Sequence, residues 1–258
     1  MHAIVAASGG MDSTSLLLHC LTRGHTVTAI SFYYGQNHSL ELTRLKRNVQ
    51  IIKDRGLSIR HSVFNLSALM SEFHSGLTGG MDIPEGYYEQ DNMKQTVVPN
   101  RNAIFSSLIY GYALSIANQT ERKTLMALGV HSGDHAIYPD CRPEFYQSLY
   151  EAFLKGNWNG DQVELYLPYI NGDKVTILQD CMESCRHLAL SFKQIMENTC
   201  TSYAPDKKGL SSGKTGSDVE RILAFHELGI KDPVGYVDGW ESALEYALTA
   251  QRQHNSIG

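Results

Sequence analysis

The chain has 258 residues, of which 42% are hydrophobic and 19% are charged, a composition that suits one large globular domain or one domain with a smaller lobe. The net charge of −5 disfavours tight non-specific binding to DNA or RNA, although it does not exclude a local basic patch. No apolar run approaches the roughly 18 residues of a membrane span, the first residues lack the features of a secretion signal, and an odd number of cysteines, five, favours a reducing cytoplasm.

Strand-like and helix-like segments alternate along the chain. We expect strands at residues 3–7, 26–35, 58–66 and 124–130, and helices at 13–22, 39–55, from about 102, from about 144, at 174–191 and in the last forty residues. This alternation predicts a doubly wound α/β fold, with a parallel sheet at 1–190 and a helical C-terminal region at 191–258. Between residues 70 and 95 the pattern is lost, and we expect a long loop that closes over the site.

A turn with the sequence SGGMDS follows the first expected strand at residues 8–13. Two glycines at a helix N-terminus let backbone N–H groups approach an anion, and nearby hydroxyls add donors. Asp12 would repel a bare phosphate, so we expect it beside a metal ion or an orienting donor. A strand–helix turn with an Asp or Ser cap is the simpler alternative. The candidate residues of this anion site, which the resemblance given next assigns to ATP, are Ser8, Gly9, Gly10, Asp12, Ser13 and Thr14.

The turn matches the SGGxDS signature of the PP-loop ATP pyrophosphatases, which hold the pyrophosphate portion of ATP while a substrate attacks the α-phosphate. Four further stretches narrow the resemblance. They are FYYGQNHSLE (32–41), VPNRN (98–102), GVHSGDHAIYPDCRPEF (129–145) and LPYINGDK (167–174). In this order and spacing they resemble the QueC family of 7-cyano-7-deazaguanine synthases, from residue 3 to about residue 233.

The resemblance implies an ATP-dependent ligase that converts the carboxylate of 7-carboxy-7-deazaguanine to an adenylate. Ammonia then gives the amide, and a second ATP takes the amide to the nitrile. Asp12, Arg101 and Lys174 are the candidate catalytic residues, because cations must neutralise charge that moves onto pyrophosphate. The alternative for each cation is a surface charge or a helix-end residue. Triphosphate chemistry also implies Mg²⁺ as a cofactor.

The base of the substrate has N–H donors that suit an acidic partner, and by resemblance the loop containing YPDCR reads it. Tyr138 is placed to stack on the base, and a second group of polar residues follows the second strand. His38 has a simpler alternative as a structural histidine. The candidate substrate-binding residues are Tyr34, Gln36, His38, Asp134, Tyr138, Asp140 and Arg142.

The sequence departs from the family near its C-terminal end. QueC proteins carry four zinc cysteines there, but the corresponding segments read NTCTSY and SSGKTGSDVER. The expected ligand positions hold Ser202, Ser212, Thr215 and Asp218, and Cys200 lies two residues away from the nearest of them. Hydroxyls do not make a structural zinc site, so we predict no zinc and a zinc-less counterpart of that segment.

Two cysteines in CMESC, Cys181 and Cys185, share a helix face. One interpretation is a redox or metal-binding pair, as in sulfur-transferring relatives of the PP-loop group. The sequence around them offers no further soft metal ligand, so we favour the alternative that both cysteines pack in the core. We expect Cys20 in the core and Cys141 behind the binding loop.

Three functional alternatives follow. The first is the QueC-type ligase, with ammonia or an amine of a partner protein as acceptor; QueC-like proteins of antiphage defence systems use the latter, and the lost zinc residues fit such a divergent member. The second is another PP-loop enzyme, such as a tRNA thiolase or an amidotransferase-linked synthetase. The third is a non-catalytic binding protein. A homodimer is compatible with each of them.

Overall fold

The computed structural model describes residues 1–35, 40–72, 86, 98–135, 138–202, 206 and 208–256, with Asp134 described by its backbone alone. At the centre of this part of the chain lies a parallel sheet of five strands in the order β3-β2-β1-β4-β5. The strands are β1 (His2–Ala6), β2 (Thr26–Tyr33), β3 (Ile59–Asn65), β4 (Thr124–Ala127) and β5 (Val163–Tyr166).

The central strand β1 is buried on both faces, as its continuous apolar sequence requires. Successive side chains of a strand point to opposite faces, so Ala3 and Val5 join one hydrophobic cluster while Ile4 joins another. The register aligns Ala3 with Val27 of β2 and with Leu125 of β4. The sheet therefore divides two cores, one on each side.

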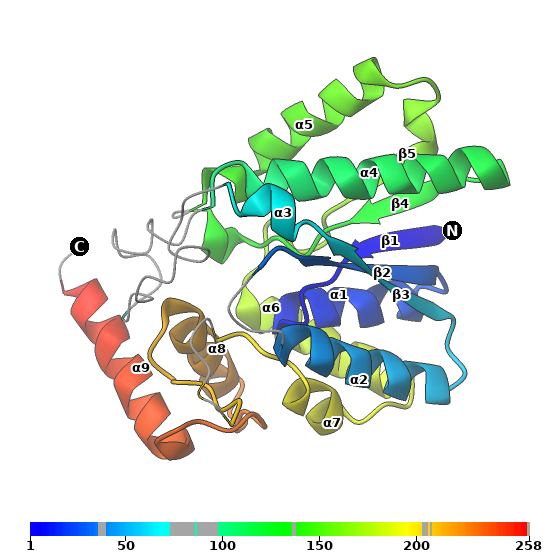
Figure 1. Cartoon of the computed structure of the whole chain (residues 1–258). Coiled ribbons are helices and arrows are strands. Elements are labelled where there is room, and N and C mark those ends of the chain that lie inside the picture. The colour runs from blue at the N-terminus through cyan, green and yellow to red at the C-terminus, as the bar shows by residue number, and fades with distance from the viewer. Residues whose placement is uncertain are drawn as a thin grey trace.

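Helices cover both faces (Figure 1). One face carries α1 (Met11–Thr22), α2 (Leu40–Asp54), α6 (Lys174–His187) and α7 (Phe192–Glu197), and the other carries α4 (Arg101–Thr120) and α5 (Pro143–Gly156). A short helix, α3 (Ser67–Met70), follows β3. The doubly wound α/β fold predicted from the sequence is confirmed.

The C-terminal helices α8 (Gly216–Glu227) and α9 (Gly239–Asn255) pack on each other through a small apolar cluster that includes Ile222 and Ala247. The opposite side of α8 contributes Phe225 to the large core beneath the sheet. The proposed boundary near residue 190 stays a prediction. No described helix has the length and apolar character that crossing a membrane requires.

Two local expectations were wrong. The edge strand β5 was not predicted, because its sequence VELY alternates only weakly and exposes three partly buried side chains. The helix expected at 174–191 ends at His187, since Ala189 adopts a left-handed backbone conformation with φ of 53°. Ser191 then caps a new helix, α7, by accepting a hydrogen bond from the Gln194 N–H at 3.3 Å.

The strand order reverses at β1, whose neighbours β2 and β4 connect to opposite faces of the sheet. Ligands of open α/β sheets bind beyond the carboxyl ends of the strands at such a switch point. The turn at residues 8–10, Tyr34 and His131 all follow strands at this edge. The fold therefore gathers the motifs that the sequence singles out.

Candidate active site

The turn between β1 and α1 is held by hydrogen bonds among its own residues. Gly9 has φ of 99°, and Gly10 is extended and serves as the N-cap of α1 without a side-chain cap bond. The Gly9 N–H donates to Ser13 Oγ at 3.3 Å, the Gly10 N–H donates to Ser8 Oγ at 3.2 Å, and the two hydroxyl oxygens lie 3.1 Å apart. The turn is thus shaped before any ligand binds.

Glycine is required at the first of these positions. A Cβ added at Gly9 would lie 2.5 Å from the backbone carbonyl oxygen of Glu41, in a φ region that side-chain-bearing residues rarely adopt. Thr14 Oγ1 is buried and has no hydrogen-bond partner among the described residues. An orphaned donor beside a helix N-terminus suits an anion, since the N–H groups of the first turn and the helix dipole favour negative charge.

Beside this turn, Lys174 lies between two carboxylates. It is the first residue of α6, is only 6% exposed, and places Nζ 2.6 Å from Asp12 Oδ2 and 3.5 Å from Glu220 Oε2. Burial raises the pKa of Asp12, but the charges of Lys174 and His131 outweigh burial and hold that pKa below its usual value. Asp12 is therefore ionised, and its remaining oxygen, Oδ1, is buried without a hydrogen-bond partner in the described structure.

Glu220 is a residue of this site that the sequence did not reveal. It comes from α8 in the C-terminal region, and its Oε1 lies 3.9 Å from Nδ1 of the buried His131. A Cβ at Gly133 would collide with Glu220 Oε1, so the Glu220 carboxylate would have to shift if this position carried another residue. The Gly133 N–H donates to His131 Nδ1 at 3.1 Å, which helps to hold the imidazole ring in place.

A second group of side chains surrounds Arg101, at the start of α4. Burial raises the pKa of Tyr34, while the charge of Arg101 and a hydrogen bond with it act in the opposite direction. Burial also raises the pKa of Glu41 to about 7, again opposed by Arg101. Arg101 is thus positioned against both Tyr34 and Glu41, and Tyr138 is close enough to influence the same tyrosine. Glu41 lies in a predicted motif but was not among the candidate site residues.

The loop after β4 folds as two 3-10 turns, Ser132–Asp134 and Pro139–Cys141. Tyr138 is buried, and the guanidinium Nε of Arg142 donates to the His135 carbonyl oxygen at 2.9 Å. Asn102 of α4 donates to the backbone oxygen of Asp140 at 3.4 Å. These contacts order the loop, with Cys141 buried behind it as predicted. Gln36, His38 and the side chain of Asp134 lie outside the described residues.

A family model described as "Queuosine biosynthesis protein QueC" matches residues 2–229 of the chain. The chain belongs to the QueC family. It is 42% identical to the 7-cyano-7-deazaguanine synthase of Pseudoalteromonas translucida, over 90% of this chain and 97% of the relative. It is 38% identical to that of Caldicellulosiruptor saccharolyticus, over 92% and 96%. Among solved structures, a 4-thiouridine synthetase bound to RNA and ATP aligns with a TM-score of 0.46 at 14% identity, over 98% of this chain and 52% of that one.

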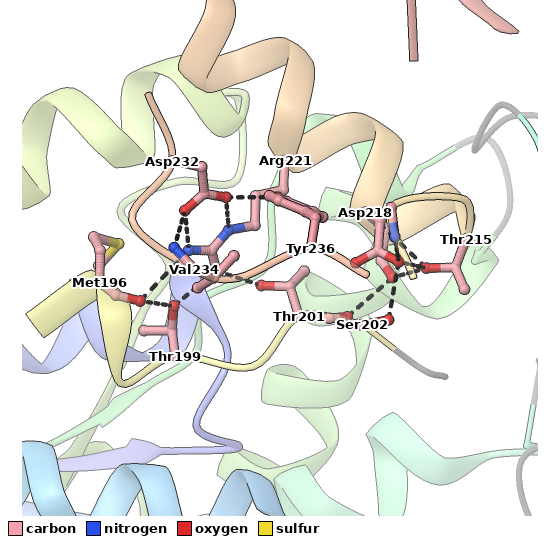
Figure 2. Close-up of polar contacts among 12 residues, drawn as sticks. Met196, Thr199, Thr201, Ser202, Thr215, Asp218, Arg221, Asp232, Val234 and Tyr236 are labelled. Atoms are coloured by element: carbon pink, nitrogen blue, oxygen red, sulfur yellow. Dashed lines mark hydrogen bonds and ion pairs between the residues drawn. The ribbon is translucent and has the colours of Figure 1, made fainter. Parts of the chain in front are cut away.

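The four positions at which the QueC zinc pattern expects ligands lie close together in the structure. Ser202, Ser212, Thr215 and Asp218, the positions expected to hold ligands, meet in a buried cluster at the start of α8 (Figure 2). The remaining cysteine pair lies elsewhere: Cys181 and Cys185 are buried in the core beneath the sheet, where they were expected.

The C-terminal segment that follows α7 also contacts the turn at residues 8–13. The Cys200 N–H donates to the Gly9 carbonyl oxygen at 3.0 Å. Together with Glu220, this contact makes the C-terminal region part of the site. No local pattern signals such a role, because both contacts join segments that are distant in the sequence.

Proposed function

We propose that the protein is an ATP-dependent carbon–nitrogen ligase that adenylates the carboxylate of 7-carboxy-7-deazaguanine and transfers the acyl group to ammonia. Relatives named 7-cyano-7-deazaguanine synthase, matched along nearly their whole length, support the substrate class. The observation that carries the reaction type is the buried Lys174 ammonium, held 2.6 Å from Asp12 beside a glycine turn with an unsatisfied Thr14 hydroxyl. Such an arrangement suits a leaving pyrophosphate.

In this proposal the turn binds the polyphosphate of ATP. The hydroxyls of Ser8, Ser13 and Thr14 and the N–H groups at the start of α1 are the donors, while Gly9 and Gly10 let the backbone come close. Lys174 adds a positive charge that Asp12 and Glu220 hold in place. Arg101 supplies a planar cation for the reacting carboxylate or phosphate.

The amide forms by two substitutions, and a second activation by ATP then leads to the nitrile. A carboxylate oxygen of the base attacks the α-phosphorus of ATP, the bond from that phosphorus to the bridging oxygen breaks, and pyrophosphate leaves. The nitrogen of ammonia then attacks the carbonyl carbon, AMP leaves with the bond's electron pair, and the nitrogen loses one proton to give the amide. A second ATP activates the amide oxygen in the same way, and loss of AMP together with both amide protons gives the nitrile. Charge builds on the leaving groups, so fixed cations lower the barrier.

Asp12 fits Mg²⁺, because its oxygen Oδ1 is buried without a hydrogen-bond partner in the described residues. Mg²⁺ is commonly held by one or two carboxylates together with substrate phosphates. No cluster of three or more possible metal-ligating side chains exists in the described part of the chain. When bound, it would neutralise phosphate charge, while Asp12 orients it and keeps Lys174 in position.

We place the base in the loop after β4, next to the Arg101 group. Tyr138 and Tyr34 are the candidates for stacking on it, and Asp140 and Asp134 for accepting its N–H donors. Arg142 acts on the loop itself, through its bond to the His135 carbonyl. Roles for Gln36 and His38 in binding the base stay predictions.

The test is to incubate the purified protein with Mg-ATP, 7-carboxy-7-deazaguanine and ammonium, and to follow nucleotides and base by mass spectrometry. We expect AMP, pyrophosphate and the amide or nitrile, and we expect Lys174→Met to lose them while still folding. Absence of AMP in the presence of the base would refute the proposal. Lys155→Met is the control, because that lysine is exposed and pairs only with a neighbouring turn of its own helix.

The same experiment separates the alternatives. Adding the proteins encoded beside this one would reveal a base-sized mass on a partner if a protein amine is the acceptor, as in an antiviral conjugation system. Adding tRNA would reveal AMP formation that depends on RNA rather than on the base. A cytoplasmic location and a homodimer stay predictions.

A further inference from the structure

A buried carboxylate organises the turn before α8 in the described structure. Asp218 Oδ2 accepts hydrogen bonds from the hydroxyls of Ser202, Ser212 and Thr215, each at 2.9 Å, and from the Gly213 N–H at 3.2 Å. Figure 2 shows Ser202, from the segment after α7, and Thr215, at the start of α8, converging on Asp218. We call the five residues the Asp218 cage.

The cage is inside the protein. Asp218 is 0% exposed, Thr215 is 1% exposed and Ser202 is 2% exposed. Burial raises the pKa of Asp218, whereas the hydrogen bonds from Thr215, Ser202 and Ser212 lower it. Burial outweighs these donors, so the pKa of Asp218 lies above its usual value, and its Oδ1 is buried without a hydrogen-bond partner among the described residues. The donors therefore compensate for only part of the water that the carboxylate has lost.

These residues do not fit a zinc ion. Hydroxyls are not among the usual structural zinc ligands. The hydroxyls of the cage donate hydrogen bonds to Asp218 Oδ2, so their hydrogens point at the oxygen that a cation would have to contact. The nearby thiol of Cys200 does not help, because burial raises its pKa to about 11 and it stays protonated at neutral pH. Its sulfur instead lies 3.9 Å from the Ser202 carbonyl oxygen.

A second buried anchor follows on the same helix. Arg221 donates to both oxygens of Asp232, at 2.6 and 2.9 Å, and to the hydroxyls of Thr199 and Thr201, at 2.7 and 2.9 Å. Burial lowers the pKa of Arg221, but Asp232 outweighs burial and keeps it above its usual value. The segment that contributes Ser202 to the cage is thus tied to α8 twice (Figure 2).

We propose that the Asp218 cage holds the start of α8 and the segment after α7 in place of a metal ion, so that the C-terminal region of this family member folds without zinc. The three hydroxyls all donate to a single oxygen, Asp218 Oδ2, and each donor–acceptor distance of 2.9 Å is that of an ordinary hydrogen bond. The cage carries the cross-link that a tetrahedral metal would otherwise provide.

The first test measures metal and stability without any reference to activity, so it stands apart from the proposed function. Purified protein, as expressed in zinc-supplemented medium, should contain well under one zinc per chain. Its melting temperature should be unchanged by a strong zinc chelator. One zinc per chain together with a chelator-induced fall in melting temperature would overturn the proposal.

The second test removes the charge of the cage. Asp218→Asn keeps the shape but takes the negative charge from four hydrogen bonds, and we expect the melting temperature to fall by about 5 °C or more. Asp238→Asn is the matched control, because Asp238 is exposed, lies in the same region and pairs only at 3.7 Å with Lys214. Equal melting temperatures for both variants would refute a structural role of the cage.

A milder variant covers the case in which Asp218→Asn does not fold. Ser202→Ala removes one donor, which raises the pKa of Asp218 further in the folded state. The variant should therefore lose more stability relative to the native protein at pH 8, where the carboxylate is ionised, than at pH 5. A loss that does not depend on pH would contradict a charged cage.

The third test restores a metal site. With Ser202→Cys, Ser212→Cys, Thr215→Cys and Asp218→Cys combined, thiolates replace the cage at positions that already converge. We expect one zinc per chain and a melting temperature that now falls with the chelator. A reduced, folded variant that binds no zinc would show that the four positions do not form a common centre.

Discussion

If Glu220 positions Lys174, then Glu220→Gln should lower the turnover number of the proposed ligase. Glutamine keeps the length of the side chain but removes the negative charge 3.5 Å from the Lys174 ammonium. Of the two carboxylates, only Asp12 would then carry a negative charge beside the lysine, and its own Oδ1 is the oxygen that we assign to the incoming cation. Lys174 would therefore be less often in the orientation that faces pyrophosphate.

The size of this effect follows from the geometry. Two unit charges 3.5 Å apart attract by about 5 kcal/mol at an effective dielectric constant of about 20. The Glu220 side chain is 20% exposed, so solvent screening and the desolvation of both groups reduce the net value to about 1–2 kcal/mol. This corresponds to about 5- to 30-fold in turnover. Removing the cation itself, in Lys174→Met, should cost about 100- to 1,000-fold.

Pyrophosphate release at saturating Mg-ATP and base is the assay, with Glu227→Gln as control, because Glu227 is an exposed residue at the end of the same helix. Since Glu220 acts through Lys174, the double variant should be no slower than Lys174→Met. A double variant whose loss is the product of the two single losses would refute the positioning role. So would a Glu220→Gln variant with unchanged turnover and a lower KM for ATP, because that pattern indicates simple repulsion of phosphate.

Three further predictions concern single positions. Gly9→Ala should abolish ATP binding measured by calorimetry, because its Cβ would meet the Glu41 carbonyl at 2.5 Å with φ of 99°. Gly111→Ala, in α4, is the control and should bind ATP normally, because its Cβ would meet nothing within 4 Å. The pKa of Glu41 is raised from 4.5 to about 7, so its contribution to stability is present below pH 4.5 and is lost as pH rises through 7. Glu41→Gln should remove this loss of stability, which is worth about 3 kcal/mol at most. Equal slopes of melting temperature against pH for the native protein and the variant would contradict this prediction. Arg221→Met should lower the free energy of unfolding, measured in urea, by about 3–5 kcal/mol, because Asp232 stays buried without its cation. Adding Asp232→Asn should recover part of this loss. A double variant with no recovery would argue against the ion pair as the cause.

The turn at residues 8–13 could be predicted from the sequence because its determinants are local. The hydrogen bonds that its residues make with one another join positions no more than five apart, as between Ser8 and Ser13. The strand–helix alternation then placed the turn at the carboxyl edge of a parallel sheet, where Tyr34 and the loop after β4 also lie. Lys174 needed the family resemblance, since a lysine at a helix start has many ordinary explanations.

Other parts of the site could not be predicted because they depend on how distant segments pack. Glu220 reaches Lys174 only because α8 lies against α6, and no spacing in the sequence reports that contact. The Asp218 cage was anticipated only as the loss of ligands, not as a new set of hydrogen bonds. The early end of α6 depends on one backbone angle, at Ala189, which helix propensity does not indicate.

Two roles on one helix also constrain how this sequence can change by insertion and deletion. Asp218 belongs to the cage and Glu220 faces Lys174, and they are separated by a single residue, Val219. Each residue of an α-helix turns the next by about 100°. One codon gained or lost between the two acids would leave the cage intact but swing Glu220 away from the lysine. Lineages that share the cage should therefore keep this spacing, even where the segments before and after α8 differ in length.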